Sequence, residues 1–295
     1  MAKKLKKIFS TLVFVVAVSI TGQTSALAKN ELKKSDYSHI IAVVGAQRMT
    51  AQQMSKETIL LALGQKNEDS IERLKIWLGE FDRTLNGLRD GDTELKLPAT
   101  KNQNILERLN KIDELWSLFK SAVRQSIADG TVSRAGVAIV ADLNVPLIQA
   151  LDDLVKEIKV ESATGHLVSM LEAAMDISGE QRMLSQKITK EVLLIAYNHD
   201  VEIYKKRLNK SMATFETNLV SMIEGNFEIK LFPAPTPQIR GQLRRVQTVW
   251  DRFRPIVEGT AKTGKISPTD IQQVVGFNAS LLKEMDKVLE MYGEL

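Results

Sequence analysis

The chain has 295 residues and no cysteine, which excludes disulfides, thiolate catalysis and thiolate metal sites. Its 40 lysines and arginines exceed its 36 acidic residues only because four lysines lie within the first seven positions. Without that segment the two counts are equal, which excludes the basic footprint of a nucleic-acid-binding protein.

Residues 1–28 have the pattern of a signal peptide. The four lysines precede an apolar run over residues 8–20, and Ala26-Leu27-Ala28 provides the small-x-small pattern of a cleavage site. The run is about 13 residues long, against the roughly 20 that a helix needs to cross a bilayer. We therefore expect cleavage after Ala28 and export of the remaining chain to the periplasm. The alternative is an uncleaved membrane anchor.

Further along the chain, apolar residues follow helical spacing. They recur at steps of three and four over residues 40–61, 74–88, 106–123 and 137–154. Breakers separate these stretches at residues 91–100 and at Asp129-Gly130, and the second half has matching breaks at residues 225–237 and 259–268. No stretch shows sustained two-residue alternation. The pattern predicts an all-α fold of two four-helix bundles with up-down-up-down connectivity.

The second half repeats the first at an ungapped spacing of 134 residues. Gly45-Ala46-Gln47-Arg48-Met49 returns as Gly179-Glu180-Gln181-Arg182-Met183, and Trp116 returns as Trp250. Aromatic residues make up only 5% of the chain, so their coincidence at one offset indicates a tandem duplication. We assign residues 29–162 to the first bundle and residues 163–295 to the second.

Two arrangements of the copies are open. A turn near residues 162–165 would place the bundles side by side and bring Arg48 toward Arg182. A fourth helix that ran straight into the fifth would stack them end to end. The absence of proline between Pro146 and the second motif slightly favours the continuous helix.

Each copy carries a polar strip on its first helix, within an arc of roughly 80°. The strips are Gly45, Arg48, Gln52 and Lys56, and Gly179, Arg182, Gln186 and Lys190. Arginine offers a planar fork suited to an oxyanion, glutamine adds a neutral donor and acceptor, and glycine allows close approach to the backbone. The strips predict a small anion held between helices by Arg48, Arg182, Gly45, Gly179, Gln52 and Gln186.

Structural roles could account for the same residues. Each arginine could pair with a carboxylate and hold its bundle together, and the glycines could serve only tight helix packing. We expect Lys56 and Lys190 to be solvated neighbours of Glu57 and Glu191 rather than ligand contacts.

No catalytic or metal-binding motif is found in the sequence. His39, His166 and His199 are isolated, with no partner at metal-ligand spacing. The GxSxG, HExxH and phosphate-loop patterns are missing. We therefore expect a protein that is not an enzyme and that uses neither a cofactor nor a metal.

The two strips resemble one known family. Residues 45–56 and 179–190 are similar to the opening helix of the type IV pilus methyl-accepting chemotaxis transducer N-terminal domain, or PilJ-type domain. The second copy is the closer match, because the first has Thr50-Ala51 where the family prefers Leu-Ser. The resemblance implies a periplasmic four-helix bundle, similar to the sensor module of nitrate/nitrite-responsive histidine kinases. It also implies that Arg48 and Arg182 contact an anion where two first helices meet, with Gly45 and Gly179 allowing close approach.

Sensors of this family lie between two transmembrane helices and precede cytoplasmic signalling modules, and we find neither in this sequence. We therefore expect a periplasmic binding protein for a small anion, with nitrate or nitrite as first candidates. It would present its ligand state to a membrane receptor or sensor protein, and a homodimer is left open. The alternative is a ligand-free structural or adaptor protein that docks onto a membrane receptor or an envelope assembly.

Overall fold

The computed structural model describes residues 34–65, 68–162 and 170–295. These residues form eight α-helices, one short 3-10 helix and no strand, which confirms the predicted all-α fold. The predicted signal peptide at residues 1–28 lies outside the described residues. The elements are α1 (Lys34–Ala62), α2 (Glu68–Asp90), α3 (Gln103–Asp129), α4 (Arg134–Ser162), α5 (Met170–Ala196), α6 (Val201–Glu224), η1 (Phe227–Ile229), α7 (Pro237–Thr263) and α8 (Pro268–Gly293).

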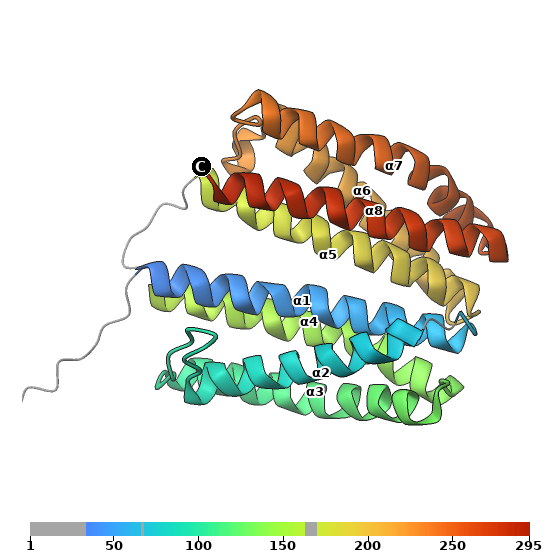
Figure 1. Ribbon diagram of the computed structural model, residues 1–295, viewed down its shortest axis with the longest axis horizontal. Helices are drawn as coiled ribbons and strands as arrows, with labels where there is room; N and C mark the ends of the chain where they lie inside the picture. The colour runs from blue at the N-terminus through green and yellow to red at the C-terminus, as the bar shows by residue number, and fades with distance from the viewer. Residues whose placement is uncertain (1–33, 66–67, 163–169) are drawn as a thin grey trace, which may run out of the picture. The chain divides into compact units, whose positions relative to one another are not determined.

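Each copy closes into a four-helix bundle. In the first copy α1 packs on α2 and α4, and α3 packs on the same two helices (Figure 1). In the second copy α5 packs on α6 and α8, and α7 on the same two. Successive helices are therefore neighbours and the last returns to the first, which is the contact order of an up-down-up-down bundle.

The duplication extends to tertiary detail. Trp116 Nε1 donates to Asp82 Oδ1 at 2.7 Å, and its counterpart Trp250 donates to Glu216 Oε1 at 3.1 Å. An isolated bridge pairs Asp92 with Leu97 after α2, and the equivalent bridge after α6 lies 134 residues later. The sequence offset thus corresponds to superposable positions in the two bundles.

Helix ends follow the predicted breakers. Asn102 accepts two backbone N–H hydrogen bonds at the start of α3, and Gly130 ends that helix with a φ of 60°. Thr236 caps α7, and Pro237 lies in the first turn, where a backbone N–H would have no partner within the helix. These ends of α3 and α7 therefore fall at breakers that the sequence predicted, whereas the breaks between α1 and α2 and between α5 and α6 were not predicted.

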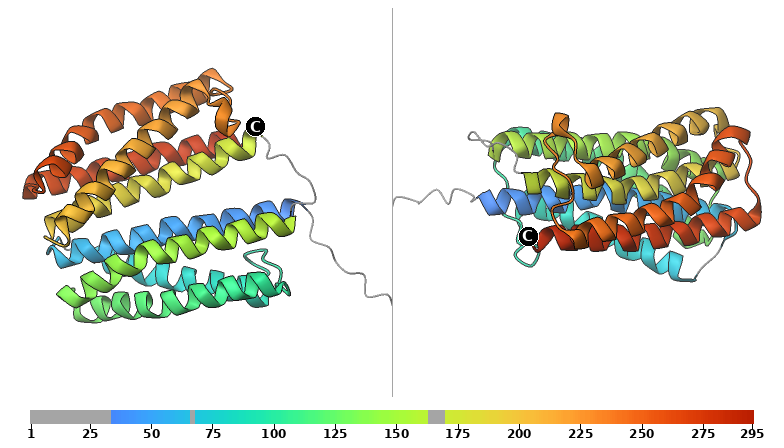
Figure 2. Two further views of the ribbon diagram at one scale, coloured as in Figure 1. Left: turned by 180° about the vertical axis from the view of Figure 1, so that it is seen from behind. Right: turned by 90° about the horizontal axis from the view of Figure 1, so that it is seen from above.

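The first helices of the two copies pack against each other, so the copies lie side by side (Figures 1 and 2). The end-to-end arrangement, which the absence of proline between Pro146 and the second motif slightly favoured, is therefore wrong. Residues 50–61 of α1 are buried except for the half-buried Gln53, and residues 184–195 of α5 are buried except for Lys187. Each of these helices is covered by its own bundle and by the other copy, so the glutamine and lysine of each strip are buried, whereas its glycine and arginine are half-buried.

Among the described helices, α4 is long and apolar enough to cross a membrane by length and composition alone. Its apolar residues pack on α1 and α3, and Val137, Leu147 and Leu154 are fully buried there. Ile139, Val145 and Val160 of the same helix are exposed.

Candidate functional site

The structure brings the two polar strips together at the α1–α5 interface. Gln52 Nε2 on α1 lies 3.8 Å from Met183 Sδ on α5, next to Arg182 in the chain. Such a meeting is possible within one chain only when the two copies lie side by side. The interface is therefore the candidate ligand site.

Both strip arginines are held by carboxylates of their own bundles. Arg48 Nη1 lies 2.7 Å from Asp152 Oδ1 on α4, and Arg182 Nε lies 2.5 Å from Asp286 Oδ1 on α8. This is the structural role that the sequence left open as an alternative. An anion could bind either guanidinium only if it displaced the aspartate or shared the guanidinium with it.

The strip glycines are not required for helix packing. A Cβ added at Gly179 would meet no atom within 4 Å. A Cβ at Gly45 would meet Arg48 Nη2 at 3.3 Å, which is the end of a flexible side chain. Tight packing is therefore the wrong explanation for the repeated glycine, and close approach of a ligand stays a prediction.

The strip glutamines are buried without adequate partners. Gln186 is 0% exposed, and neither its amide nitrogen nor its amide oxygen has a hydrogen-bond partner among the residues that the structure describes. Gln52 is 1% exposed, its oxygen has no partner, and its nitrogen reaches only the thioether of Met183. Leaving such a buried group unpaired costs about 1–3 kcal/mol. Native proteins usually satisfy such groups, so these amides indicate a site for a polar ligand or water.

The expectation that Lys56 and Lys190 are solvated is wrong. Lys56 is 9% exposed and Lys190 1% exposed, because each extends across the interface to the fourth helix of the other copy. Lys56 Nζ donates to Asn278 Oδ1 at 3.0 Å, and Lys190 Nζ donates to Asn144 Oδ1 at 2.5 Å. The result is a pair of reciprocal hydrogen bonds between the bundles.

Each asparagine is oriented by the first helix of its own copy. Asn144 Nδ2 donates to Ala51 O at 3.1 Å, and Asn278 Nδ2 donates to Ser185 O at 2.9 Å. The carbonyl of each amide is thereby turned toward the lysine of the other copy. Sequence reasoning missed this role, although a signal was present: asparagine interrupts the apolar stripe at the same position in both copies.

The first copy neutralises its buried lysine. Glu57 Oε1 lies 3.4 Å from Lys56 Nζ, and Glu57 Oε2 accepts from Ser70 Oγ at 2.6 Å and from Arg73 Nη2 at 3.0 Å. Burial alone would raise the pKa of Glu57, but these three partners lower it below its ordinary value. Glu57 is therefore an ionised counter-charge for Lys56.

The second copy has lost this arrangement. Tyr204 occupies the position equivalent to Ser70, and Arg207, equivalent to Arg73, donates to Tyr204 Oη at 3.2 Å. Glu191 Oε2 has no hydrogen-bond partner, and burial raises the pKa of Glu191. Burial also lowers the pKa of Lys190 to about 7, with the charge of Glu191 offsetting only part of the effect.

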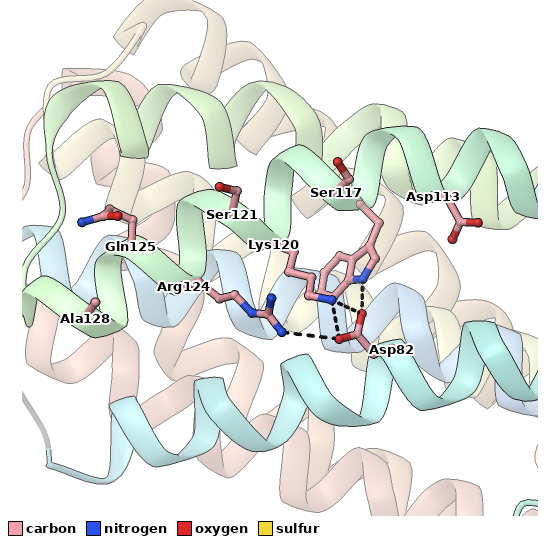
Figure 3. Close-up of a pocket in the computed structure, with 9 residues that line it drawn as sticks. Asp82, Asp113, Ser117, Lys120, Ser121, Arg124, Gln125 and Ala128 are labelled. Carbon is pink, nitrogen blue, oxygen red and sulfur yellow. Dashed lines mark hydrogen bonds and ion pairs between the residues drawn. The ribbon is translucent and has the colours of Figure 1, made fainter.

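Two grooves lie elsewhere on the bundles. One, of about 630 Å³, is lined by residues of α2 and α3, including Asp113, Ser117 and Arg124 (Figure 3). Its central carboxylate, Asp82, is already engaged by Lys120 Nζ at 2.5 Å. The other, of about 640 Å³, is lined by residues of α7 and α8. Neither groove is lined by a residue of the polar strips.

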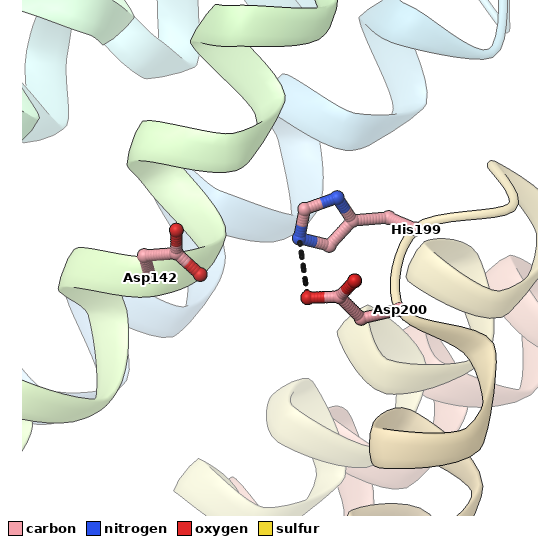
Figure 4. A group of neighbouring side chains, drawn as sticks. All are labelled: Asp142, His199 and Asp200. Atoms are coloured by element: carbon pink, nitrogen blue, oxygen red, sulfur yellow. Dashed lines mark ion pairs between the residues drawn. The ribbon is translucent and has the colours of Figure 1, made fainter.

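The structure brings Asp142 of α4 close to His199 and to Asp200, which follows the histidine in the chain. Ligand atoms of Asp142, His199 and Asp200 lie within 4.8 Å of one another (Figure 4). Both aspartates are exposed, and such groups commonly occur without an ion, so we infer no metal site. His39 Nε2 lies 2.8 Å from Leu95 O, and His166 lies outside the described residues.

Comparison with known proteins matches both bundles to one family. The model of the type IV pili methyl-accepting chemotaxis transducer N-terminal domain (PilJ) matches residues 33–138 and 171–275, more than half of the chain. A relative, the methyl-accepting chemotaxis protein McpN of Pseudomonas aeruginosa, is 25% identical over 124 residues, which are 42% of this chain and 22% of the relative. The matched part thus spans about a fifth of that receptor's length. The chain belongs to the PilJ family and carries two tandem copies of its domain.

Proposed function

We propose that this protein is a periplasmic sensory protein that binds a small anion at the α1–α5 interface, with nitrate and nitrite as first candidates. The family and the similar receptor are those of a non-catalytic sensory domain, which points to a role in chemotaxis-type sensing. The observation that carries the proposal is Gln186, whose amide is fully buried and unpartnered on the predicted strip. A small ligand with hydrogen-bonding oxygens would satisfy it.

The charges near the interface favour an anion over a neutral ligand. Of the four basic side chains of the strips, Arg48, Arg182 and Lys56 already have carboxylate partners, and only Lys190 has none within 4 Å among the described residues. Asp152 and Asp286 engage the two arginines from the rim of the interface, where both carboxylates are partly exposed. A planar oxyanion could accept two N–H groups from one guanidinium and displace its aspartate toward water.

Thermal unfolding of the purified protein in nitrate, nitrite, sulfate, chloride and small carboxylates tests the proposal. A ligand that binds only the folded state raises the melting temperature in a concentration-dependent manner. We expect a rise with one planar oxyanion and none with chloride at equal ionic strength. Loss of that rise in Arg48→Ala or Arg182→Ala would identify the arginines as contacts.

Two glutamine variants separate binding from folding. Gln186→Leu removes an amide without partners, so stability should be kept while the anion-dependent rise disappears. Gln181→Leu is the matched control, because Gln181 Nε2 donates to Phe215 O at 3.0 Å inside the second bundle. This control variant should lower the stability of the protein but keep the anion-dependent rise in melting temperature. A rise that survives in Gln186→Leu would contradict the proposed site.

The alternative function, an adaptor without a ligand, is favoured by one observation. The segment between α6 and α7 exposes three large apolar side chains, Phe227 (79% exposed), Ile229 (47%) and Phe232 (46%). Exposed apolar clusters of this kind often mark a protein contact. If no anion shifts the melting temperature of the folded protein, docking through this segment becomes the better explanation.

A further inference from the structure

We propose that Lys190 and Gln186 of the second copy form the anion-binding centre of the interface, and that Lys56, the duplicate of Lys190, does not bind the anion. This inference rests on the proposed function and deepens it, because it assigns the binding charge to one lysine. The strip arginines then hold the bundles together through their aspartates and contribute less to binding.

The geometry places the two groups together. Gln186 and Lys190 are four residues apart on α5, so their side chains lie on one face of the helix. Both are almost completely buried, at 0% and 1% exposure. The amide nitrogen of Gln186 has no acceptor, and the ammonium group of Lys190 has only the neutral carbonyl of Asn144. Two adjacent buried donors therefore lack a negatively charged acceptor.

Charge compensation distinguishes the two copies. Among the described residues, no carboxylate oxygen lies within 4 Å of Lys190 Nζ, whereas Glu57 Oε1 lies 3.4 Å from Lys56 Nζ. Glu57 is held in the ionised form by Ser70 and Arg73. A buried cation without a counter-ion is unfavourable, and a monovalent anion is the smallest group that would neutralise it.

The cause of the difference is one substitution between the repeats. Ser70 supports Glu57 in the first copy, and its equivalent is Tyr204. Arg207 packs on Tyr204, with its Cζ 5.0 Å from the ring centre, and its Nη1 donates to the hydroxyl, whereas Arg73 donates to Glu57. Glu191 lacks the hydrogen bonds that Ser70 and Arg73 give Glu57. Burial outweighs the effects of Lys190, Lys187, Ser211 and Arg207 and raises the pKa of Glu191, so Glu191 offsets the charge of Lys190 only in part.

Binding of the anion would change the contact between the copies. Its oxygen would accept from Lys190 Nζ and replace Asn144 Oδ1, which belongs to α4 of the first copy. Because the pKa of Lys190 is lowered to about 7, binding above that pH takes up one proton from solvent. The charged groups that act on this lysine are Glu191, Lys187 and Arg207. Occupancy of the site is thus linked to a bond that joins the two bundles.

Titration of nitrate into the full chain by calorimetry tests the inference, with nitrite as the second probe. We expect Lys190→Met to lose roughly tenfold or more in affinity, the size expected for a charged hydrogen bond, and Lys56→Met to bind within a few-fold of wild type. Titration at pH 8 in buffers of different ionisation enthalpy should show proton uptake in wild type and none in Lys190→Met.

A second variant tests the same idea without altering the binding residues. Tyr204→Ser restores the residue of the first copy, so Arg207 can turn to Glu191 and ionise it. The carboxylate would then neutralise Lys190, and nitrate affinity should fall. If Lys190→Met does not fold, Tyr204→Ser still tests whether the uncompensated charge of Lys190 binds nitrate.

The outcomes separate the two proposals. If Lys190→Met binds nitrate like wild type while Arg182→Ala does not, Lys190 is not the binding charge and the proposed function stands. If Lys56→Met and Lys190→Met lose affinity equally, the assigned asymmetry is overturned. If the folded wild-type protein binds neither nitrate nor nitrite nor any other anion of the panel, both proposals fail.

Discussion

Replacing Asn144 by alanine tests the polar network between the copies. The amide nitrogen of Asn144 donates to Ala51 O at 3.1 Å and to Ser55 Oγ at 2.8 Å, and its oxygen accepts from Lys190 Nζ. The variant loses two neutral hydrogen bonds, each contributing about 1 kcal/mol, and leaves a buried ammonium group without its acceptor, at about 1.5–3 kcal/mol more. We therefore expect a loss of stability of about 3–5 kcal/mol.

The equivalent change at Asn278 is the matched control. Asn278 donates to Ser185 O at 2.9 Å and accepts from Lys56 Nζ at 3.0 Å. When Asn278 is removed, Lys56 keeps its ion pair with Glu57 at 3.4 Å, so the buried charge stays compensated. Asn278→Ala should therefore cost less, about 2–3 kcal/mol.

Urea unfolding at pH 6, below the pKa of about 7 of Lys190, followed by circular dichroism, measures both losses. The decisive comparison repeats Asn144→Ala in a Lys190→Met background, where no ammonium group is left unpaired. There the cost of Asn144→Ala should fall to about 2 kcal/mol. Equal costs in the two backgrounds, or a larger loss for Asn278→Ala than for Asn144→Ala, would refute the reasoning.

Two further predictions concern the same interface. The pKa of Lys190 is about 7 in the folded protein against an ordinary value of 10.5, so between these values the unfolded chain binds more protons and stability should rise with pH. The midpoints of urea unfolding from pH 7 to pH 10 test this prediction, and an identical rise of stability in Lys190→Met would contradict it. Gly179→Ala should raise stability by about 1 kcal/mol, because its Cβ meets no atom within 4 Å. If the same variant leaves nitrate affinity unchanged, close approach of the ligand to this glycine is excluded.

Much of the fold could be read from the sequence because it depends on local spacing. Steps of three and four between apolar residues mark the face of a helix, and Gly130 and Pro237 mark ends that their backbone chemistry imposes. The duplication could be read as well, since Trp116 and Trp250 recur at one offset and occupy matched positions.

The site could be read only in part. The strips, in which glycine, arginine and glutamine recur in a helical arc, lie on the two helices that meet in the structure, α1 and α5. The roles within the strip were beyond the sequence. Asp152 and Asp286, which engage the arginines, are both 104 residues away along the chain. Nothing in local spacing indicates which carboxylate a guanidinium will meet.

The helices, their repeat and the polar strips can be recognised from the order of residues alone, since each is a pattern along one segment. The packing of α1 on α5, the burial of Lys56 and Lys190 and the difference in their charge compensation become visible only in the folded chain. The physical reason is that periodicity tells which face of a helix is polar but not what covers that face. Burial and the pKa of a charged group depend on atoms brought together through space, from helices more than a hundred residues apart.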